Sequence, residues 1–185
     1  AQGETQNQTA QTATASAERR DRMILSDRSI QDCIENGTIE VSPEPTVEQI
    51  QPASLDVRLG GEFVSPDNTK FVDMPVGDVF WLDPGQCWLG ITKERIGLSA
   101  GVAATVTGRS TLGRKFVTVH VTAGWLDPGW DGHVTLELTN FGDRSVAIPI
   151  GARIGQVVFF ELDAPAENPY DGQYDGNGPE VAGEL

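Results

Sequence analysis

Short runs in which β-branched and aromatic residues alternate with small or polar ones fill most of the chain after about residue 53. Gly, Pro, Asp or Asn interrupts these runs about every eight to twelve residues, a spacing typical of short antiparallel strands joined by turns. The runs are SLDVRL, VFWLD, CWLGIT, GVAATVT, FVTVHVT, HVTLELT, SVAIPI and IGQVVFF. The segments Asp83-Pro84-Gly85 and Asp127-Pro128-Gly129 have the composition of tight reversals. We therefore predict an all-β fold, a sandwich or jelly roll, with no helix among these strands.

One short helix is predicted ahead of the strands. Ser26 can cap its start, and Ile30, Cys33 and Ile34 follow at i, i+3 and i+4 spacing. Gly37 suits the left-handed position just past the end of such a helix. The apolar face formed by these residues is narrow, so we expect the helix to lie on the larger β domain.

The two ends of the chain differ from the middle in composition. Residues 1–22 are mostly Gln, Thr, Ala and Ser without an apolar period, which predicts a disordered N-terminal extension. From Glu161 to Leu185 there are seven acidic residues and no basic one. We therefore predict a β domain over residues 23–162 and a flexible acidic arm over residues 163–185, in which Tyr170 and Tyr174 could provide docking contacts.

The net charge of the chain limits the classes of molecule that we expect it to bind. Asp and Glu number 27 against 13 Lys and Arg, which gives a formal net charge of −14. Such a surface repels nucleic acid, so none is expected as a partner. The acidity serves solubility in one interpretation, and adaptation to molar salt in the other. No apolar run approaches the roughly 20 residues that span a bilayer, so we expect no membrane association and a cytoplasmic location.

The metal-binding and redox residues are few and scattered. Cys33 and Cys87 stand far apart without a CxxC motif, which makes a disulfide framework or a thiolate metal site unexpected. His120 and His133 come without an HxE or HExxH motif. We predict no metal held by protein side chains and no zinc-dependent chemistry.

The densest polar segment is GRSTLGR, residues 108–114. Arg109 and Arg114 offer two guanidinium groups, Ser110 and Thr111 offer hydroxyl groups, and the flanking glycines free the backbone amides. In an acidic protein this local cluster suits a polyphosphate. It is not a P-loop, because that motif requires Lys followed by Ser or Thr and then a helix. An ordinary polar turn is the alternative.

A second candidate segment runs over residues 123–137. Its turn carries Asp127 and Trp130 and leads into a strand in which the apolar residues of HVTLELT take one face and Glu137 takes the other. Glu137 therefore lies on a polar face. That face lines a pocket if the protein forms a closed oligomer, and it faces solvent if the protein is a monomer.

Six segments together carry a resemblance to a known family. MILSDRSI, QPASLDVRLG, GRSTLGR, HVTAGWLDPGWDGHVTLELTNFG, PIGARIGQVVFF and the terminal NPY…GP resemble the dCTP deaminases of the dUTPase-like superfamily. The resemblance covers most of residues 23–180. It implies a distorted jelly-roll (dUTPase-like) fold and a homotrimer with active sites between subunits. It also implies dCTP and dUTP as ligands, Mg²⁺ bound through the nucleotide phosphates, and dTTP as a candidate inhibitor.

The resemblance also implies a role for individual residues. Glu137 matches the glutamate that moves protons between a water and the pyrimidine ring, and Asp127 matches the acid that serves the sugar and the hydrolytic water in dUTPases. Ser110 matches a residue that holds the water and the base, which completes the predicted catalytic set. Asp56 and Arg153 look like parts of two further superfamily motifs and are expected to pair. The substrate-binding residues implied are Arg109, Ser110, Thr111, Arg114, Ala123, Asp127, Trp130, Gln156, Tyr170 and Tyr174.

The function implied is deamination of dCTP without zinc. The combination of Asp127 with Glu137, and the Ala123-Gly124 pair, resemble the bifunctional members that also cleave dUTP to dUMP and pyrophosphate. Two alternatives are kept. A dUTPase alone is favoured by Asp127, Trp130 and an arm that carries Gln173 where the family pattern has a lysine. A non-catalytic nucleotide-binding regulatory protein would keep the fold without turnover.

Overall fold

The computed structural model of the chain describes residues 24–172. The predicted N-terminal extension and the part of the arm from residue 173 onward, which includes Tyr174, lie outside the described residues. The elements are α2 (Asp27–Glu35), β1 (Ile39–Ser42), η1 (Val47–Gln49), β2 (Ile50–Gln51), β3 (Ser54–Val64), β4 (Phe71–Asp73), β5 (Val79–Leu82), β6 (Cys87–Leu98), β7 (Val102–Gly108), α3 (Ser110–Gly113), β8 (Val117–Thr118), β9 (Trp125–Leu126), β10 (Asp131–Asn140), β11 (Val146–Pro149) and β12 (Arg153–Glu161).

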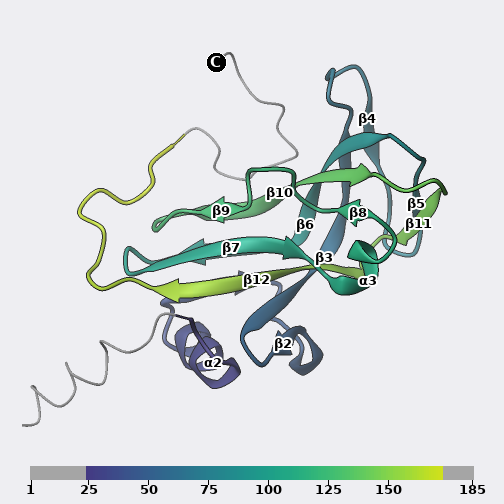
Figure 1. The fold of residues 1–185 in the computed structure, drawn as a ribbon. Helices are drawn as coiled ribbons and strands as arrows, with labels where there is room; N and C mark the ends of the chain where they lie inside the picture. Colours follow the sequence, from purple (N-terminus) through teal and green to yellow (C-terminus); the bar gives the residue numbers. More distant parts are fainter. Residues whose placement is uncertain (1–23, 173–185) are drawn as a thin grey trace, which may run out of the picture.

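One curled sheet of ten strands dominates the fold (Figure 1). Its main path runs β8-β10-β6-β3-β12-β7-β9, with β1 on β6 and both β2 and β4 on β3, while β5 and β11 form a separate pair. The sheet has two halves, one that contains β2, β12, β7 and β9 and one that contains β1, β4, β6, β8 and β10. Strand β3 belongs to both halves, because it pairs with β12 near its start and with β6 and β4 near its end. The all-β prediction is confirmed.

Two glycines allow β3 to pass between the halves. The β3–β6 register shifts between Leu59 and Phe63, which brackets Gly60 and Gly61. A Cβ atom on Gly61 would lie 2.2 Å from the carbonyl oxygen of Met74, and one on Gly60 would lie 3.0 Å from that of Ile91. Side chains at these positions would therefore separate β3 from its neighbours.

The core lies between the two halves of the curled sheet. Phe63 is fully buried and stacks on Phe80 with ring centroids 4.1 Å apart. The Trp88 ring contacts Phe80 edge-on, with ring centroids 5.7 Å apart. Aromatic pairs of this kind add about 0.5–1.5 kcal/mol to the burial of their apolar area. In β10 the alternation is as predicted, since Val134, Leu136 and Leu138 are buried.

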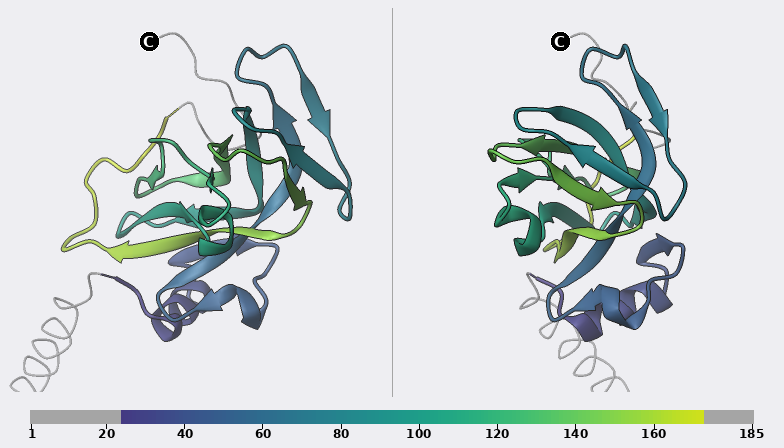
Figure 2. Two further views of the ribbon diagram at one scale, coloured as in Figure 1. Left: turned by 45° about the vertical axis from the view of Figure 1, so that its right-hand side comes forward. Right: turned by 90° about the vertical axis from the view of Figure 1, so that its right-hand side faces the viewer.

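The predicted N-terminal helix is α2, which lies with β2 against the outside of the sheet (Figure 2). The Ser26 hydroxyl oxygen accepts from the Ser29 amide at 3.4 Å, and Gly37 has a φ of +76°. Ile30 is buried, and Cys33 and Ile34 pack against the core. The predicted turns also form, because Gly85 and Gly129 have φ values of +75° and +89°.

The prediction of no helix among the strands after residue 53 is wrong, because α3 lies between β7 and β8. η1 and α3 are each a single turn, and α3 is closed by the amides of Leu112 and Gly113, which donate to the Arg109 carbonyl at 3.0 and 3.1 Å. One turn is too short to repeat an apolar position, so periodicity carries no signal for it. No helix of the described residues is long and apolar enough to cross a membrane.

The start of the predicted arm lies along the β domain. The amides of Leu162, Ala166 and Tyr170 donate to the carbonyls of Gly101, Ala100 and Pro128 at 2.9, 2.8 and 2.7 Å. The flexibility of the arm stays a prediction.

Candidate functional site

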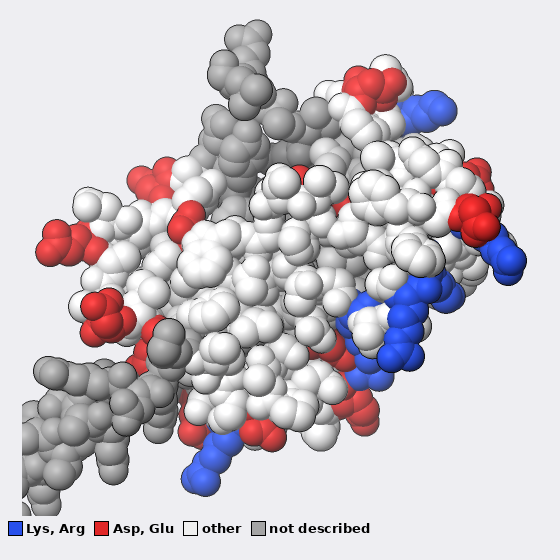
Figure 3. All heavy atoms as spheres, viewed as in Figure 1, with Lys and Arg blue, Asp and Glu red and all other residues white. Residues whose placement is uncertain are grey.

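The GRSTLGR segment forms the end of β7 and the single turn α3. The Arg109 amide donates to the Ile154 carbonyl at 3.0 Å, which fixes the start of the turn against β12. Ser110, Thr111 and Arg114 are exposed. In Figure 3 a cluster of Lys and Arg side chains lies over the α3 region of this acidic protein. This part of the surface is therefore suited to an anion.

Arg109 is held by a buried carboxylate. Asp56 on β3 is 1% exposed, and its Oδ2 lies 3.2 Å from Nε of Arg109 and 3.2 Å from Nη1 of Arg153. Nη1 of Arg109 also donates to the Arg153 carbonyl at 3.2 Å. The expected pairing of Asp56 with Arg153 is confirmed. Burial raises the pKa of the Asp56 carboxyl, and the charges of Arg109 and Arg153 oppose that shift.

Glu137 lies in β10 beneath the loop that follows β8. Its own amide donates to the Val119 carbonyl at 2.9 Å, and its Oε2 accepts from the amides of Val121 at 2.5 Å and Thr122 at 3.2 Å. The backbone of this loop thus orients the carboxylate. The sequence gives no signal for the two amide donors, because a backbone amide is the same at every residue.

The Ala123-Gly124 pair joins the same loop to β7. The Gly124 carbonyl accepts from the Val106 amide at 2.7 Å and from the Thr105 hydroxyl at 2.9 Å. A Cβ atom on Gly124 would lie 2.9 Å from the Val106 carbonyl oxygen and 3.2 Å from the His120 ring. Glycine is therefore required for this close approach, while Ala123 is exposed.

Asp127, Trp130 and Tyr170 gather around the turn between β9 and β10. Oδ1 of Asp127 accepts from the Trp125 indole at 3.0 Å, and the Trp130 and Tyr170 rings lie with centroids 5.6 Å apart. Gly129 permits this arrangement, because a Cβ atom there would lie 2.7 Å from Cβ of Pro169. The predicted docking contact of Tyr170 is thus present in the structure.

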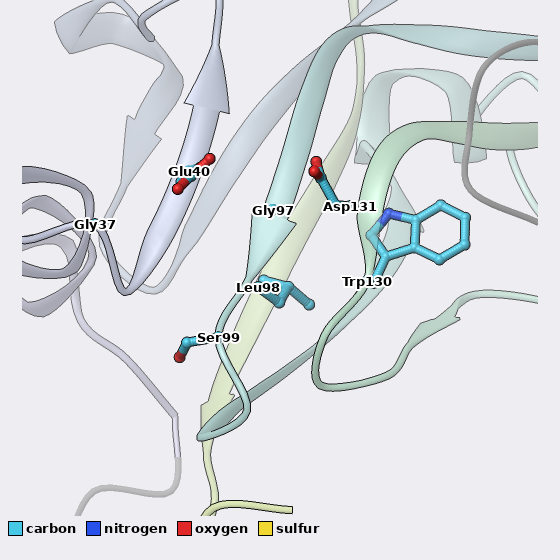
Figure 4. Close-up of a pocket in the computed structure, with 7 residues that line it drawn as sticks. All are labelled: Gly37, Glu40, Gly97, Leu98, Ser99, Trp130 and Asp131. Atoms are coloured by element: carbon cyan, nitrogen blue, oxygen red, sulfur yellow. The ribbon is translucent and has the colours of Figure 1, made fainter. Parts of the chain in front are cut away.

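A cavity of about 160 Å³ is lined in part by Trp130 (Figure 4). Glu40 on β1 and Asp131 on β10 flank Gly97 of β6 and line the cavity with their carboxylates. Asp131 also pairs with Arg95 at 2.7 Å. Two carboxylates repel a triphosphate, so this cavity does not suit the phosphates of a nucleotide.

The predicted residues thus fall into three groups of contacts within one chain. Arg109, Ser110, Thr111 and Arg114 surround α3; Glu137 and Ala123 belong to the loop after β8; Asp127, Trp130 and Tyr170 surround the β9–β10 turn. Gln156 is half-buried on β12, between Asp56 of β3 and Thr107 of β7. The first two groups are adjacent, since a Cβ atom on Gly108 would lie 3.7 Å from the Val119 side chain.

Solved structures place this fold among the dUTPase-like proteins. The dCTP deaminase of Agrobacterium tumefaciens superimposes with a TM-score of 0.63 at 22% identity, over 77% of this chain and 49% of its own. This chain thus spans about half the length of that protein. A dUTPase from Staphylococcus phage 80alpha superimposes with a TM-score of 0.51 at 16% identity, over 74% of this chain and 98% of its own. The fold is therefore the dUTPase-like fold.

Sequence comparison defines the family. The family described as dCTP deaminase-like matches residues 24–162. The dUMP-forming dCTP deaminase of Halobacterium salinarum is 42% identical over 183 residues, which cover 86% of this chain and 94% of that protein. The dCTP deaminase of Natronomonas pharaonis is 43% identical over 166 residues, covering 80% of this chain and 85% of that protein. The chain belongs to the dCTP deaminase-like family.

Proposed function

We propose that this protein deaminates dCTP with one water to give dUTP and ammonia, and then cleaves dUTP with a second water to give dUMP and pyrophosphate. The observation that carries the proposal is the Glu137 carboxylate, which two loop amides orient on the polar face of β10. The name of the Halobacterium relative, a dUMP-forming dCTP deaminase, supports the second step.

The two carboxylate oxygens of Glu137 differ in their hydrogen bonds, and Oε1 is the oxygen proposed to accept a proton. Oε2 accepts from Val121 and Thr122, and no bond to Oε1 is formed within residues 24–172. Oε1 can therefore take a proton from the water that attacks C4 of cytosine. The same carboxyl then returns a proton to the departing ammonia, as a general base and acid in turn. The Ser110 hydroxyl is proposed to hold that water.

Cleavage of dUTP needs a second water and compensation for the charge of the phosphates. Asp127 is exposed beside Trp130, so its carboxylate is proposed to bind the deoxyribose and align that water, with Trp130 against the sugar. Arg109, Thr111, Arg114 and Gln156 are proposed to contact the phosphates. Tyr170 and Ala123 would border the nucleoside, and the proposed role of Tyr174 lies outside the described residues.

Mg²⁺ fits this arrangement as an ion carried by the nucleotide. Mg²⁺ usually binds through one or two carboxylates and substrate phosphates. Among residues 24–172 no three His, Cys, Asp or Glu side chains are placed to hold a metal. The nucleotide phosphates would hold the ion, and the ion would offset their charge. dTTP is proposed as an inhibitor, and the cytoplasm as the site of action.

We further propose that three copies assemble and that each active site combines groups from two of them. An uncharged face covers β7, β9 and β12 (Figure 3). Its register places Thr105, Val158 and Trp125 side by side, and the 54% exposed Trp125 packs 5.7 Å from Phe160. Such a face lets copies of a −14 chain approach without direct repulsion between carboxylates.

Light scattering after size exclusion tests the assembly. Trp125→Glu should convert a trimer to monomers. Trp81→Glu is the matched control, because Trp81 is 61% exposed on β5, outside the uncharged face. A parent protein that elutes as a monomer would refute the assembly.

Product analysis tests the chemistry. The protein is incubated with dCTP and Mg²⁺ in concentrated potassium chloride, and dCTP, dUTP, dUMP and pyrophosphate are separated over time. We expect dUMP and pyrophosphate to appear without accumulation of dUTP. Accumulated dUTP would leave deamination alone, and cleavage of dUTP with dCTP unchanged would indicate a dUTPase. Binding without turnover would favour the regulatory alternative.

A further inference from the structure

We infer that Asp56 is a positioning residue for nucleotide phosphates, which acts by holding the Arg109 guanidinium beside α3. The inference rests on the proposed function, because that function supplies the triphosphate ligand. Asp56 itself is 1% exposed and cannot reach a ligand on the surface. Its effect must therefore pass through the arginines that contact it.

The geometry fixes one side of the guanidinium and leaves another side open. Nε of Arg109 lies 3.2 Å from Oδ2 of Asp56, and Nη1 donates to the Arg153 carbonyl at 3.2 Å. Within residues 24–172 no bond is formed by Nη2 of Arg109. The Arg109 side chain is 29% exposed, so this remaining nitrogen can donate to a phosphate oxygen.

Asp56 carries less charge than the two arginines that contact it. One carboxylate lies between two guanidinium groups, those of Arg109 and Arg153, so Asp56 alone does not neutralise both of them. The Glu48 carbonyl accepts from Nη1 of Arg153. A hydrogen bond from its own backbone amide and, to a smaller extent, the charge of Arg153 lower the pKa of the Glu48 carboxyl, so the Glu48 carboxylate offsets part of the charge of Arg153 and not that of Arg109. Positive charge at a partly exposed arginine favours a bound anion.

The chain contains a second buried carboxylate that serves as an internal comparison. Glu94 is fully buried, and its oxygens accept from Nε of Arg58 at 2.5 Å, from the Arg58 amide at 2.7 Å and from Nε2 of Gln49 at 3.0 Å. One carboxylate here faces one guanidinium, so the pair is neutral. Nε2 of Gln49 also donates to the Asp56 backbone carbonyl at 2.9 Å, but among the described residues neither Glu94 nor its partners bond to α3 or to the Arg109 side chain.

Replacement of Asp56 by asparagine tests the inference. Both arginines contact Oδ2, so the amide oxygen can take that place, but it lacks the negative charge that holds two guanidinium groups side by side, and the anchor of Arg109 is weakened. Loss of a charge-assisted hydrogen bond to a phosphate weakens binding by roughly 10- to 100-fold. We expect Asp56→Asn to raise the Kd of a non-hydrolysable imido analogue of dUTP by about 10- to 100-fold. The Kd of deoxyuridine, which has no phosphate, should stay unchanged.

Two comparisons separate positioning from a loss of folding stability. Glu94→Gln removes a buried carboxylate in the same way, and it should leave the Kd of the dUTP analogue unchanged. In an Arg109→Gln background, Asp56→Asn should weaken binding of the analogue no further, because the residue through which Asp56 acts is already gone.

The possible outcomes distinguish the two proposals. An Asp56→Asn protein with the parent's Kd overturns the inference, as does an equal loss in Glu94→Gln or an equal loss for deoxyuridine. A parent that binds the analogue but does not turn over dCTP overturns the proposed function alone. A parent that binds no analogue overturns both.

Arg109→Lys keeps the test decisive if Asp56→Asn does not fold. A lysine ammonium can still reach Asp56, so the buried carboxylate stays paired, but lysine lacks the second outward donor. This variant should bind the dUTP analogue about 10-fold or more weakly and bind deoxyuridine normally. An unchanged Kd for the analogue would refute the inference.

Discussion

Replacing Glu137 by glutamine separates its chemical role from its role in orienting the loop after β8. Glutamine has nearly the same shape, and its carbonyl oxygen can still accept from the amides of Val121 and Thr122. It cannot accept a proton at neutral pH. A group that acts as general acid or base contributes roughly 10²- to 10⁴-fold, and Glu137 is proposed to act in both capacities. We therefore expect dCTP deamination to fall by at least about 10³-fold.

The same change has a modest expected effect on stability. Hydrogen bonds to a charged group are roughly twice as strong as neutral ones, and a neutral bond contributes about 1 kcal/mol. Weakening two such bonds costs about 1–2 kcal/mol, which lowers the Tm of a domain of this size by about 2–8 °C. The folded fraction at 25 °C should not change measurably.

The assay follows ammonia release and nucleotide products at saturating dCTP, with the Kd for dCTP measured separately. Glu161→Gln, on the strand β12, is the matched control and should deaminate dCTP at the parent rate. We expect Glu137→Gln to bind dCTP within a few-fold of the parent. Deamination by Glu137→Gln at the parent rate would refute the reasoning and leave Glu137 as a residue that only holds the loop.

Three further predictions concern the arm, a surface loop and salt. Gly129→Ala adds a methyl group at a φ of +89° and 2.7 Å from Cβ of Pro169, so residues 169–170 should separate from the turn. The substitution should lower the free energy of unfolding by about 1–3 kcal/mol and change the Trp fluorescence. Unchanged fluorescence and Tm would contradict this prediction. Hydrogen bonds from Ser65 and Thr69 lower the pKa of Asp67, so its ionised form stabilises the folded state above the unfolded pKa of about 3.8. The Tm deficit of Asp67→Asn should therefore be present at pH 7 and shrink as the pH falls below about 4, and a deficit that grows on acidification would show the opposite sign. Because the Debye length shrinks from about 10 Å at 0.1 M to about 3 Å at 1 M salt, repulsion among the carboxylates should weaken, and both Tm and dCTP turnover should rise toward 1 M potassium chloride. A steady loss of both would indicate that the acidity serves solubility alone.

Local chemistry made much of the fold predictable from the sequence. The alternation in HVTLELT placed Val134, Leu136 and Leu138 in the core, since successive side chains of a strand point to opposite faces. The Pro-Gly turns were predictable because Gly85 and Gly129 accept a positive φ without strain. Strand β1 was not predicted, because its four residues, IEVS, bury fully only Ile39 and resemble a polar loop.

The candidate site was predictable only as a set of residues. The resemblance to a family indicated Asp56 and Arg109 separately, but their contact joins β3 to the end of β7 across β12. Such a contact depends on the strand order, which no local pattern encodes. The hydrogen bonds from the amides of Val121 and Thr122 to Glu137 could not be predicted for a similar reason, because they depend on the path of the loop after β8.

The place of β12 in the sheet also determines when the chain can fold during synthesis. β12 is the last strand of the described residues, yet it lies between β3 and β7, with Gln156 opposite both Asp56 and Thr107. Ile24 and Leu25 at the other end also pair with it. Until residues 153–161 leave the ribosome, β3 and β7 each present an unpaired edge, which other chains can join. The sheet is therefore completed after translation of the whole domain, through distant pairings that form slowly.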